Sequence, residues 1–522
     1  MPDTKPGTHG HQPRHDVVPP LGTSFRAGRF GRMVPELTSP FAAPDDALID
    51  LGLAMVDKKK SDPARDNANI PACFTYLGQF IDHDITLDTT TLAEVSQDPT
   101  AIMNFRTPRL DLDSVYGLGP RVQPSLYDRH SPGHAKLLLG RTTIGGKEAI
   151  KAGLPHDLPR NPQGMAIIGD ERNDENLLVA QTHVAFLRFH NAIVDRLAGT
   201  VAEDDLFDTA RRAVVDLYQA MVIRDFLTKI CDVNDVEAVL RDGRHFFRFE
   251  TFGSCGQPYM PVEFSTAAYR LGHSMVREEY SHNRIFDPAT FDLLFLFTAK
   301  SGALGTDGVG PANKPTLPSD WIIDWRRFAD FGATGVPLNL SRNIDPYLTP
   351  ALHDIGPPPP VPPTTPQEKA MRSLAVMNLR RGVKMMLPSA QDLANFMGIA
   401  SLTPAQIGDP GSDDGKAAKK HGLHVSTPLW YYILKEAEVL HGGAHLGPLG
   451  SRLVAETFIG LLQGDPESIL SRNKHWRLGQ PLHGLILPGA DESFGFSDLL
   501  EIAAGGTATG ELSPVDDPAN QP

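Results

Sequence analysis

The stretch Phe74 to Asp88, FTYLGQFIDHDITLD, constrains the fold of this chain more than any other. If it forms a helix, Gln79, Asp82 and His83 stand at positions i, i+3 and i+4 and share one face, while an apolar stripe covers roughly the opposite side. The stretch contains no Lys, Arg or Glu. A helix without a charged solvent face is expected to be buried on all sides, so the sequence predicts a central helix with polar chemistry on one face.

Two carboxylates of this helix, Asp82 and Asp84, need partners from elsewhere in the chain, because buried carboxylates are strongly disfavoured without a cation or a hydrogen bond. A single His in a core helix is most often a hydrogen-bonded core residue, so His83 alone would not indicate function. Three polar side chains on one face do favour a functional site. A divalent-metal hydrolase is a second interpretation, since adjacent His and Asp residues also bind metals.

Composition narrows the class of protein. The chain has 522 residues, of which 41% are hydrophobic, so its length allows about two to four domains around an ample core. The net charge of -14 argues against nucleic acid or an anionic membrane surface as a partner, because both require clustered cations. Only three cysteines occur, at Cys73, Cys231 and Cys255, which is too few for a disulfide framework.

The sequence also bears on location. No apolar run reaches the roughly 18 residues that a membrane-spanning helix needs, so we expect no transmembrane segment. Residues Met1 to Asp16 are too polar for a Sec-type signal peptide. We therefore expect a protein that is cytoplasmic or secreted by a non-classical route.

A second polar segment, Thr107 to Gly117, reads TPRLDLDSVYG. Thr107, Arg109, Asp111 and Asp113 occupy alternate positions, which would direct their side chains to one side of an extended loop. Calcium binds six to eight oxygens from carboxylates, hydroxyls and carbonyls, and is the natural partner of such a loop. The plain alternative is an Asp-rich turn without an ion.

Two further segments contain charged residues in helical spacing. Gly169 to Asn176, GDERNDEN, is expected to open a long amphipathic helix, in which acids of the first turn are ordinary dipole partners. Arg172 and Glu175 are i, i+3 neighbours there, and their simplest relation is a weak surface ion pair. The stretch Asp204 to Cys231 predicts another long helix.

The segment Phe264 to Arg277, FSTAAYRLGHSMVR, predicts a helix with Ser265 as its N-cap. Small residues surround His273, which would let a flat ligand or another stretch of backbone approach closely. Beyond a proline-rich connector at 356–366, the helix predicted at Ala375 to Gly382, AVMNLRRG, displays Asn378 and Arg381 one turn apart.

Taken in order, the motifs GQFIDHD, DSVYG, GDERNDE, YRLGH and MNLRRG resemble those of the animal-type haem peroxidases of the peroxidase-cyclooxygenase superfamily, particularly its bacterial members. The resemblance covers about residues 70 to 470. It implies one large, mainly α-helical catalytic domain at 41–502 with haem in its core and the connector 356–366 inside it. An extended N-terminal arm at 1–40 and a C-terminal tail at 503–522 would flank this domain.

The resemblance also implies roles for individual residues. His83 matches the distal acid/base, Arg172 the catalytic arginine, and Gln79 the neighbour at the halide or water site. His273 matches the proximal iron ligand, with Asn378 as its partner and Arg270 and Arg381 near the haem propionates. Asp82 and Glu175 match carboxylates that form ester links to haem b. The calcium ligands implied are Asp84, Thr107, Arg109 through its carbonyl, Asp111 and Asp113, the last of which is Ser in many animal members.

The implied function is reduction of hydrogen peroxide coupled to oxidation of small electron donors, halides or thiocyanate. Relatives with a third, sulfonium link to haem have Met directly after the matching Glu, where this chain has Asn176. A haem-dependent fatty-acid dioxygenase is an alternative, but its radical Tyr stands three residues before the proximal His, where this chain has Arg270. Tyr269, next to it, would point elsewhere on a helix. A non-catalytic haem-binding protein is the third interpretation.

Overall fold

The computed structural model describes residues 28–58, 62–87, 103–250, 258–299, 316–355, 362–487, 493–506 and 510–521. Within these ranges the fold is mainly α-helical, as predicted. The longer helices are α1 (Asp45–Ala54), α2 (Cys73–Ile85), α4 (Leu177–Leu197), α5 (Glu203–Met221), α7 (Val233–Asp242), α10 (Leu374–Lys384), α11 (Ala390–Met397), α13 (Asp413–Lys420), α14 (Leu429–His441), α15 (Pro448–Gln463) and α17 (Phe496–Ala504). The short helices are α3 (Asp113–Tyr116), α6 (Leu227–Ile230), α8 (Val262–Thr266), α9 (Pro366–Ala370), α12 (Pro404–Ile407) and α16 (Ile469–Asn473). Over the described part of the chain, no helix combines the length and the apolar character needed to cross a membrane.

The strands are short and tie distant segments together. The strand β1 (Gly28–Gly31) pairs antiparallel with β3 (Met103–Asn104) and parallel with β4 (Met260–Pro261). Two further antiparallel pairs join β2 (Asp66–Pro71) to β7 (Leu340–Arg342) and β5 (Glu279–Tyr280) to β6 (Ala289–Thr290). The end of the proposed N-terminal arm is thereby anchored to the body, where Met33 also donates its backbone N–H to the buried Glu263. Residues 1–27 lie outside the described ranges.

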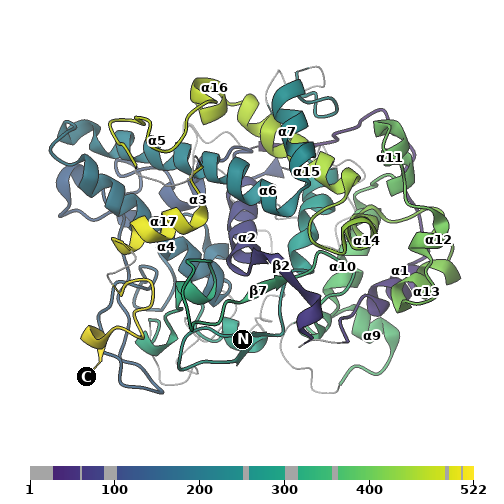
Figure 1. The fold of residues 1–522 in the computed structure, drawn as a ribbon, viewed down its shortest axis with the longest axis horizontal. Coiled ribbons are helices and arrows are strands. Elements are labelled where there is room, and N and C mark those ends of the chain that lie inside the picture. Colours follow the sequence, from purple (N-terminus) through teal and green to yellow (C-terminus); the bar gives the residue numbers. More distant parts are fainter. Residues whose placement is uncertain are drawn as a thin grey trace, which may run out of the picture.

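Helix α2 lies in the middle of the molecule, with α4, α5 and α17 on one side and α10, α14 and α15 on the other (Figure 1). It follows β2 directly and ends at Ile85, where the hydroxyl of Thr86 donates to the carbonyl of Asp82. Its apolar side is fully buried through Leu77, Phe80 and Ile81. The prediction of a central, buried helix is confirmed.

Two predicted helical segments differ in detail in the structure. The predicted helix Asp204 to Cys231 is a continuous run of α5, a π-helical segment (Val222–Phe226) and α6. Helix α4 begins only at Leu177, because Asn176 adopts an extended backbone and caps it by accepting from the N–H of Val179. The GDERNDEN motif upstream is instead a 3-10 turn over Glu171–Asp174.

The prediction of one helix over Phe264 to Arg277 is wrong. Helix α8 ends at Thr266, Ala267 breaks the helical geometry, and a 3-10 helix follows over Ala268–His273. Ser265 lies inside α8 and does not cap it. The break lets the rings of Phe264 and Tyr269 stack with centroids 4.7 Å apart, whereas residues five apart on an α-helix would point about 140° away from each other.

Candidate functional site

His83 lies on α2 with its imidazole buried, at 4% exposure. Its Nδ1 atom is 2.8 Å from Oδ1 of Asn173 in the Glu171–Asp174 turn. An amide oxygen only accepts hydrogen bonds, so Nδ1 carries the ring proton and Nε2 keeps its lone pair. Burial lowers the pKa of His83, and the cationic Arg172 lowers it further. The side chain is therefore a neutral base at neutral pH.

The amide of Asn173 bridges two histidines. Its Nδ2 atom lies 3.0 Å from Nδ1 of His183, a residue of α4 that is completely buried. Burial lowers the pKa of His183 to about 3, so this ring is neutral and its Nδ1 accepts the amide proton. The two contacts fix the amide orientation, and with it the tautomer of His83. The sequence analysis did not single out Asn173 or His183, because nothing in the spacing of a uniformly buried α4 distinguishes His183.

Arg172 lies directly against the end of α2. Its Nη2 atom donates to the carbonyls of His83 and Thr86, at 2.9 and 2.7 Å. It also forms an ion pair with the buried Asp170 at 2.7 Å, so its partner is not the surface acid expected from sequence, Glu175. The Arg172 side chain keeps 21% exposure, which leaves part of the guanidinium accessible.

The acid that holds Arg172 is itself held by a second arginine. Asp170 accepts from Nε of Arg106 at 3.0 Å, and Nη1 of Arg106 donates to Asp113 at 3.2 Å. Burial opposes ionisation of Asp170, but Arg172 and Arg106 together keep its pKa well below the usual range. Arg106 and Asp170 were not predicted, although both stand at the edges of motifs that were.

Gln79, Glu175 and Asn176 form one polar cluster beside His83. Nε2 of Gln79 donates to Glu175 at 3.2 Å, and Nδ2 of Asn176 donates to Oε1 of Gln79 at 3.0 Å. Asp82, one turn along α2 from Gln79, accepts from the hydroxyl of Thr86 at 3.0 Å. The structure thus brings together the polar face of α2 and the 169–176 motif, as the sequence analysis expected.

His273 ends the 3-10 helix Ala268–His273, and its Nδ1 atom lies 2.8 Å from Nδ2 of Asn378 on α10. Oδ1 of Asn378 accepts from Nη1 of Arg270 at 2.9 Å. Nδ1 of His273 is therefore engaged by Asn378. Coordination through Nε2 requires the proton on Nδ1, whereas in this orientation of the Asn378 amide Nδ1 accepts from Nδ2. A half-turn of the amide would favour the other tautomer, at the cost of the hydrogen bond from Arg270.

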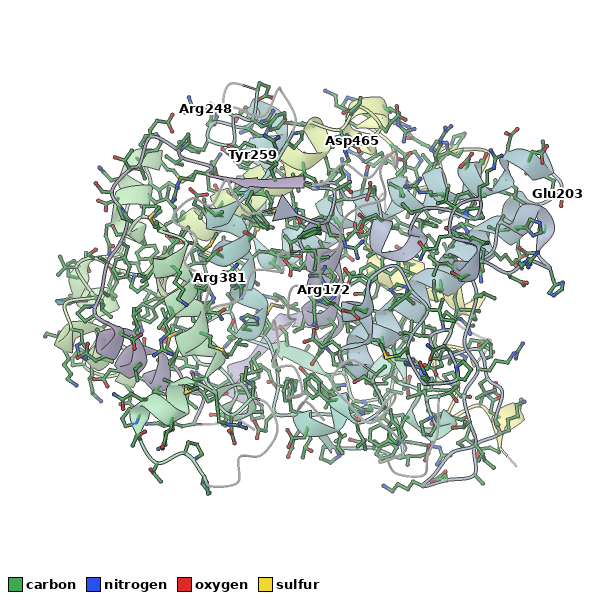
Figure 2. All side chains as sticks on the ribbon, turned by 180° about the vertical axis from the view of Figure 1, so that it is seen from behind. Arg172, Glu203, Arg248, Tyr259, Arg381 and Asp465 are labelled. Atoms are coloured by element: carbon green, nitrogen blue, oxygen red, sulfur yellow. The ribbon has the colours of Figure 1, made fainter. Side chains whose placement is uncertain are left out.

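Two contacts connect the His273 turn with its surroundings. The hydroxyl of Tyr269 donates to the carbonyl of Gly78 on α2, 3.2 Å away, so Tyr269 points toward the helix that carries His83. The indole N–H of Trp430 donates to the carbonyl of Arg270 from α14. Arg381, labelled in Figure 2, lies one turn beyond Asn378 on α10, as the spacing predicted. Arg381 is half-buried, but Asn378 is buried, so the helix does not display both side chains.

The predicted donors suit an iron porphyrin. Gln79 and Asp82 are partly exposed, although most residues of α2 are buried. Arg172 and His273, which lie outside α2, are partly exposed as well. A Cβ built on Gly272, next to His273, would meet no atom within 4 Å. The imidazole nitrogen, the carboxylates and the arginines are the types of group that bind iron, haem edges and propionates.

A cluster of acidic side chains includes Asp84, the residue that follows His83. Carboxylate oxygens of Asp84, Asp111 and Asp113 all lie within 4.8 Å of one another, and the hydroxyl of Thr107 contacts Asp111 at 3.2 Å. Burial, together with the repulsion among the acids, raises the pKa of Asp84 well above the usual range and that of Asp113 to about 7. Such a cluster suits a hard divalent cation with oxygen ligands.

The loop that supplies this cluster is not extended, which corrects the expectation from sequence. Leu112 adopts a left-handed conformation and α3 begins at Asp113, so the acids converge through a tight bend rather than through strand alternation. Arg109 donates its backbone N–H to the carbonyl of Thr107, and its side chain leads away to Asp465. Its carbonyl as a ligand stays a prediction.

The chain is similar to known haem peroxidases in sequence and in fold. Residues 89–293 match the family model described as animal haem peroxidase. The thyroid peroxidase of Canis lupus familiaris is 26% identical over 401 residues, and that of Sus scrofa is 29% identical over 397 residues. These alignments cover 71% and 70% of this chain but only 38% of each relative. The chain therefore spans well under half the length of these relatives.

Solved structures with the same fold include peroxidase A from Dictyostelium discoideum, with a TM-score of 0.53, 15% identity and coverage of 85% of this chain and 89% of that one. A fatty acid alpha-dioxygenase from Arabidopsis thaliana has a TM-score of 0.55 and 14% identity over 82% of this chain and 71% of that one. The fold is thus shared by both kinds of enzyme. Together, these findings show that residues 89–293 match the animal haem peroxidase family model, that the chain has thyroid peroxidase homologues, and that its fold is the helical fold of the peroxidase-cyclooxygenase neighbours.

Proposed function

We propose that this protein is a haem peroxidase that reduces hydrogen peroxide and oxidises small electron donors, halides or thiocyanate. The observation that carries the proposal is the pairing of His83 and Arg172. A neutral imidazole with a free Nε2 and a partly exposed guanidinium lie on the same side of the site, joined by the bond from Arg172 to the His83 carbonyl. These two groups supply the proton transfer and charge stabilisation that cleavage of a peroxide bond requires.

Haem, when bound, supplies the iron that binds peroxide and the electrons that reduce it. Nε2 of His83 takes the proton from one peroxide oxygen and returns it to the other as that oxygen leaves. The guanidinium of Arg172 is permanently charged and stabilises the negative charge of the leaving oxygen. His273 would hold the iron, Asn378 would orient the ring, and Arg270 and Arg381 would bind the propionates.

We further propose that Asp82 and Glu175 form ester links with the haem. Each carboxylate accepts a hydrogen bond from a neutral side chain, Thr86 and Gln79 respectively. These bonds orient the two acids on the polar side of α2. Retention of haem after denaturation in acid and organic solvent is the property that reveals such links.

We propose that the cluster of Asp84, Asp111 and Asp113 binds one calcium ion, with Thr107 and the carbonyl of Arg109 as further ligands. Three carboxylates at this distance repel one another strongly in a buried site, and a divalent cation removes that repulsion. Because Asp84 is the residue after His83, the ion would also hold the end of α2 in place.

The purified protein should display a Soret absorption band and a peroxide-dependent oxidation of a phenolic dye. His83→Ala should lower the rate of the peroxide reaction by about a hundredfold or more while the Soret band remains. His475→Ala, a change of an exposed histidine outside the site, should leave the rate unchanged. Full activity in His83→Ala would refute the mechanism.

Fatty-acid oxygenation is tested in the same preparation. Arg270 occupies the position of the radical tyrosine in that branch, and it is engaged with Asn378. We therefore expect no oxygen uptake with linoleate in the absence of an electron donor. Rapid uptake under these conditions would favour a dioxygenase, and a Soret band without turnover over a broad panel of donors would favour a haem-binding protein without catalytic activity.

A further inference from the structure

Asp232, His441 and His445 form a cluster outside the residues of the peroxidase site. One ligand atom from each side chain, a carboxylate oxygen or an imidazole nitrogen, lies within 4.8 Å of the other two. The two imidazole rings are in contact, with centroids 4.1 Å apart. All three residues are partly exposed, so a solvated ion can reach them.

The orientation of His445 is the second observation that indicates a ligand. Its Nδ1 atom lies 2.9 Å from the carbonyl oxygen of Leu446, which can only accept a hydrogen bond. Nδ1 therefore carries the proton and Nε2 presents its lone pair. Metal-binding histidines are commonly fixed in this way by a bond from the other ring nitrogen to a backbone carbonyl.

Asp232 is also held in place by hydrogen bonds, and its carboxylate can accept further ones. It caps helix α7, and its Oδ1 accepts from the backbone N–H of Asn234 at 2.8 Å. Its own backbone N–H donates to the hydroxyl of Ser451. A carboxylate has about four lone-pair directions, so the second oxygen can bind an ion while the first continues to cap the helix.

The loop that carries His445 is held from several directions. Nδ2 of Asn67 donates to the carbonyls of Gly443 and Ala444, at 3.1 and 3.0 Å, and the backbone N–H of Leu446 donates to the carbonyl of Ile230. His441 is the last residue of α14, where the helix dipole also favours a cation. The ligands are thus positioned before an ion binds, which lowers the cost of binding.

The ligand set determines the class of ion. Two imidazoles and one carboxylate are typical of Zn²⁺ and the neighbouring late first-row metals, whereas Ca²⁺ and Mg²⁺ prefer oxygen ligands alone. Three protein ligands leave a fourth position of a tetrahedral site for water. We propose that Asp232, His441 and His445 bind one divalent transition-metal ion of the zinc type, which links the end of α14 to the start of α7.

The test measures zinc binding by the full-length protein without an affinity tag. The protein is stripped with chelator and dialysed into millimolar calcium, so that the acidic cluster around Asp84 does not compete for zinc. The parent and every variant carry His9→Ala, His11→Ala and His15→Ala, so that these histidines, which lie outside the described residues, do not bind zinc. Titration against a chromophoric chelator should give one tight equivalent of zinc and a rise in the melting temperature.

Each ligand variant should lose this equivalent. His441→Ala and His445→Gln should weaken zinc binding by at least about tenfold, and the Gln amide can still donate to the Leu446 carbonyl and preserve the loop. Asp232→Asn should also weaken it, while Asn continues to cap α7. The melting temperatures of these variants in chelator should match that of the parent, which shows that they fold.

The matched control is His130→Ala with His134→Ala. These two histidines are exposed and have the same spacing as His441 and His445, and Asp128 precedes them. This double variant should bind zinc as tightly as the parent does. The proposal is overturned if the parent binds no more zinc than His445→Gln, or if the control loses as much affinity as the ligand variants.

Discussion

Arg106 donates from Nε and Nη2 to one carboxylate oxygen of Asp170, and through this acid it connects the cluster of Asp84, Asp111 and Asp113 with Arg172. The chain of contacts runs from Asp113 through Arg106 and Asp170 to Arg172. Each link is a charge-assisted hydrogen bond in a largely buried setting, where such bonds are strong and their loss is costly. The position of Arg172 therefore depends on a residue that takes no part in the chemistry.

We predict that Arg106→Gln destabilises the protein by about 3 kcal/mol, because it removes the arginine that contacts Asp113 and leaves Asp170 with one arginine in place of two. The rate of the peroxide reaction should fall as well, since Asp170, the partner of Arg172, is no longer held by Arg106. Urea unfolding and stopped-flow kinetics measure the two effects. Arg241→Gln, a change in an exposed ion pair, should alter neither quantity. If Arg106→Gln has the same free energy of unfolding as this control, the proposed network is contradicted.

A second prediction concerns the amide of Asn173. With the native Asn, His83 has a lowered pKa and stays neutral, so the rate should fall only when the pH drops through that low value. Asn173→Asp puts a carboxylate beside Nδ1, which raises the pKa of His83 and moves the acid limb of the pH profile to higher pH. The second-order rate constant for peroxide, measured against pH, checks this. Asn395→Asp on the exposed face of α11 should leave the profile in place, and an unmoved limb in Asn173→Asp would rule out the proposed contact.

The sequence predicted those parts of the site that depend on local pattern. The absence of charge between Phe74 and Asp88 indicated a buried central helix, and α2 occupies Cys73–Ile85. The helical spacing of Asn378 and Arg381 likewise placed both on α10. Periodicity reports which residues of one element share a face, and it was reliable for that purpose.

Relations across the fold could not be predicted in the same way. Arg106 and Asp170 are 64 positions apart, and no local pattern indicates that they meet. The break at Ala267, after which Tyr269 stacks on Phe264, could not be predicted from the helical propensity of the segment either. The resemblance to a family supplied the catalytic residues, but not the groups that hold them.

A third prediction concerns calcium and pH. Without the ion, burial and mutual repulsion raise the pKa of Asp113 from 3.8 to about 7, so the folded state retains a proton that the unfolded state has lost. The free energy of unfolding should therefore fall as the pH rises from about 4 to about 7. Saturating calcium replaces the proton on Asp113, so the free energy of unfolding should then no longer fall over this pH range. Unfolding curves with calcium and with chelator measure the difference.

Asp111→Ala is the matching variant for this cluster. It should abolish the effect of calcium on stability and broaden the Soret band, because the end of α2 is no longer held by the ion. Asp330→Ala, a change of an exposed acid, serves as the control. Elemental analysis that finds no calcium in active protein would refute the assignment.

A fourth prediction concerns the covalent links to haem. Peroxide-treated wild-type protein should retain its haem through extraction with acid and organic solvent, and the Asp82→Ala, Glu175→Gln double variant should release it. Each single variant should retain the haem through one link, visible as a distinct mass of the haem-bearing peptide. If wild-type protein releases all of its haem after peroxide treatment, the two carboxylates are hydrogen-bonding groups only.

The last prediction concerns halide preference and depends on Asn176. A sulfonium link at this position would withdraw electrons from the haem, and Asn cannot form one, so we expect oxidation of chloride to be weaker than that of bromide, iodide or thiocyanate. Asn176→Met should raise the ratio of chloride to bromide oxidation. The substitution has a structural cost as well, because Asn176 caps α4 through the N–H of Val179 and donates to Gln79.

Asn176→Ala separates these two effects, since it loses the cap, at a cost of about 1 kcal/mol, without adding a sulfur atom. Both variants should have a similarly lowered melting temperature, and only Asn176→Met should gain chloride oxidation. Mass spectrometry of the haem-bearing peptide reveals whether the sulfonium bond forms. If it forms and the chloride-to-bromide ratio of Asn176→Met still equals that of Asn176→Ala, electron withdrawal at this position does not set the halide preference of the enzyme.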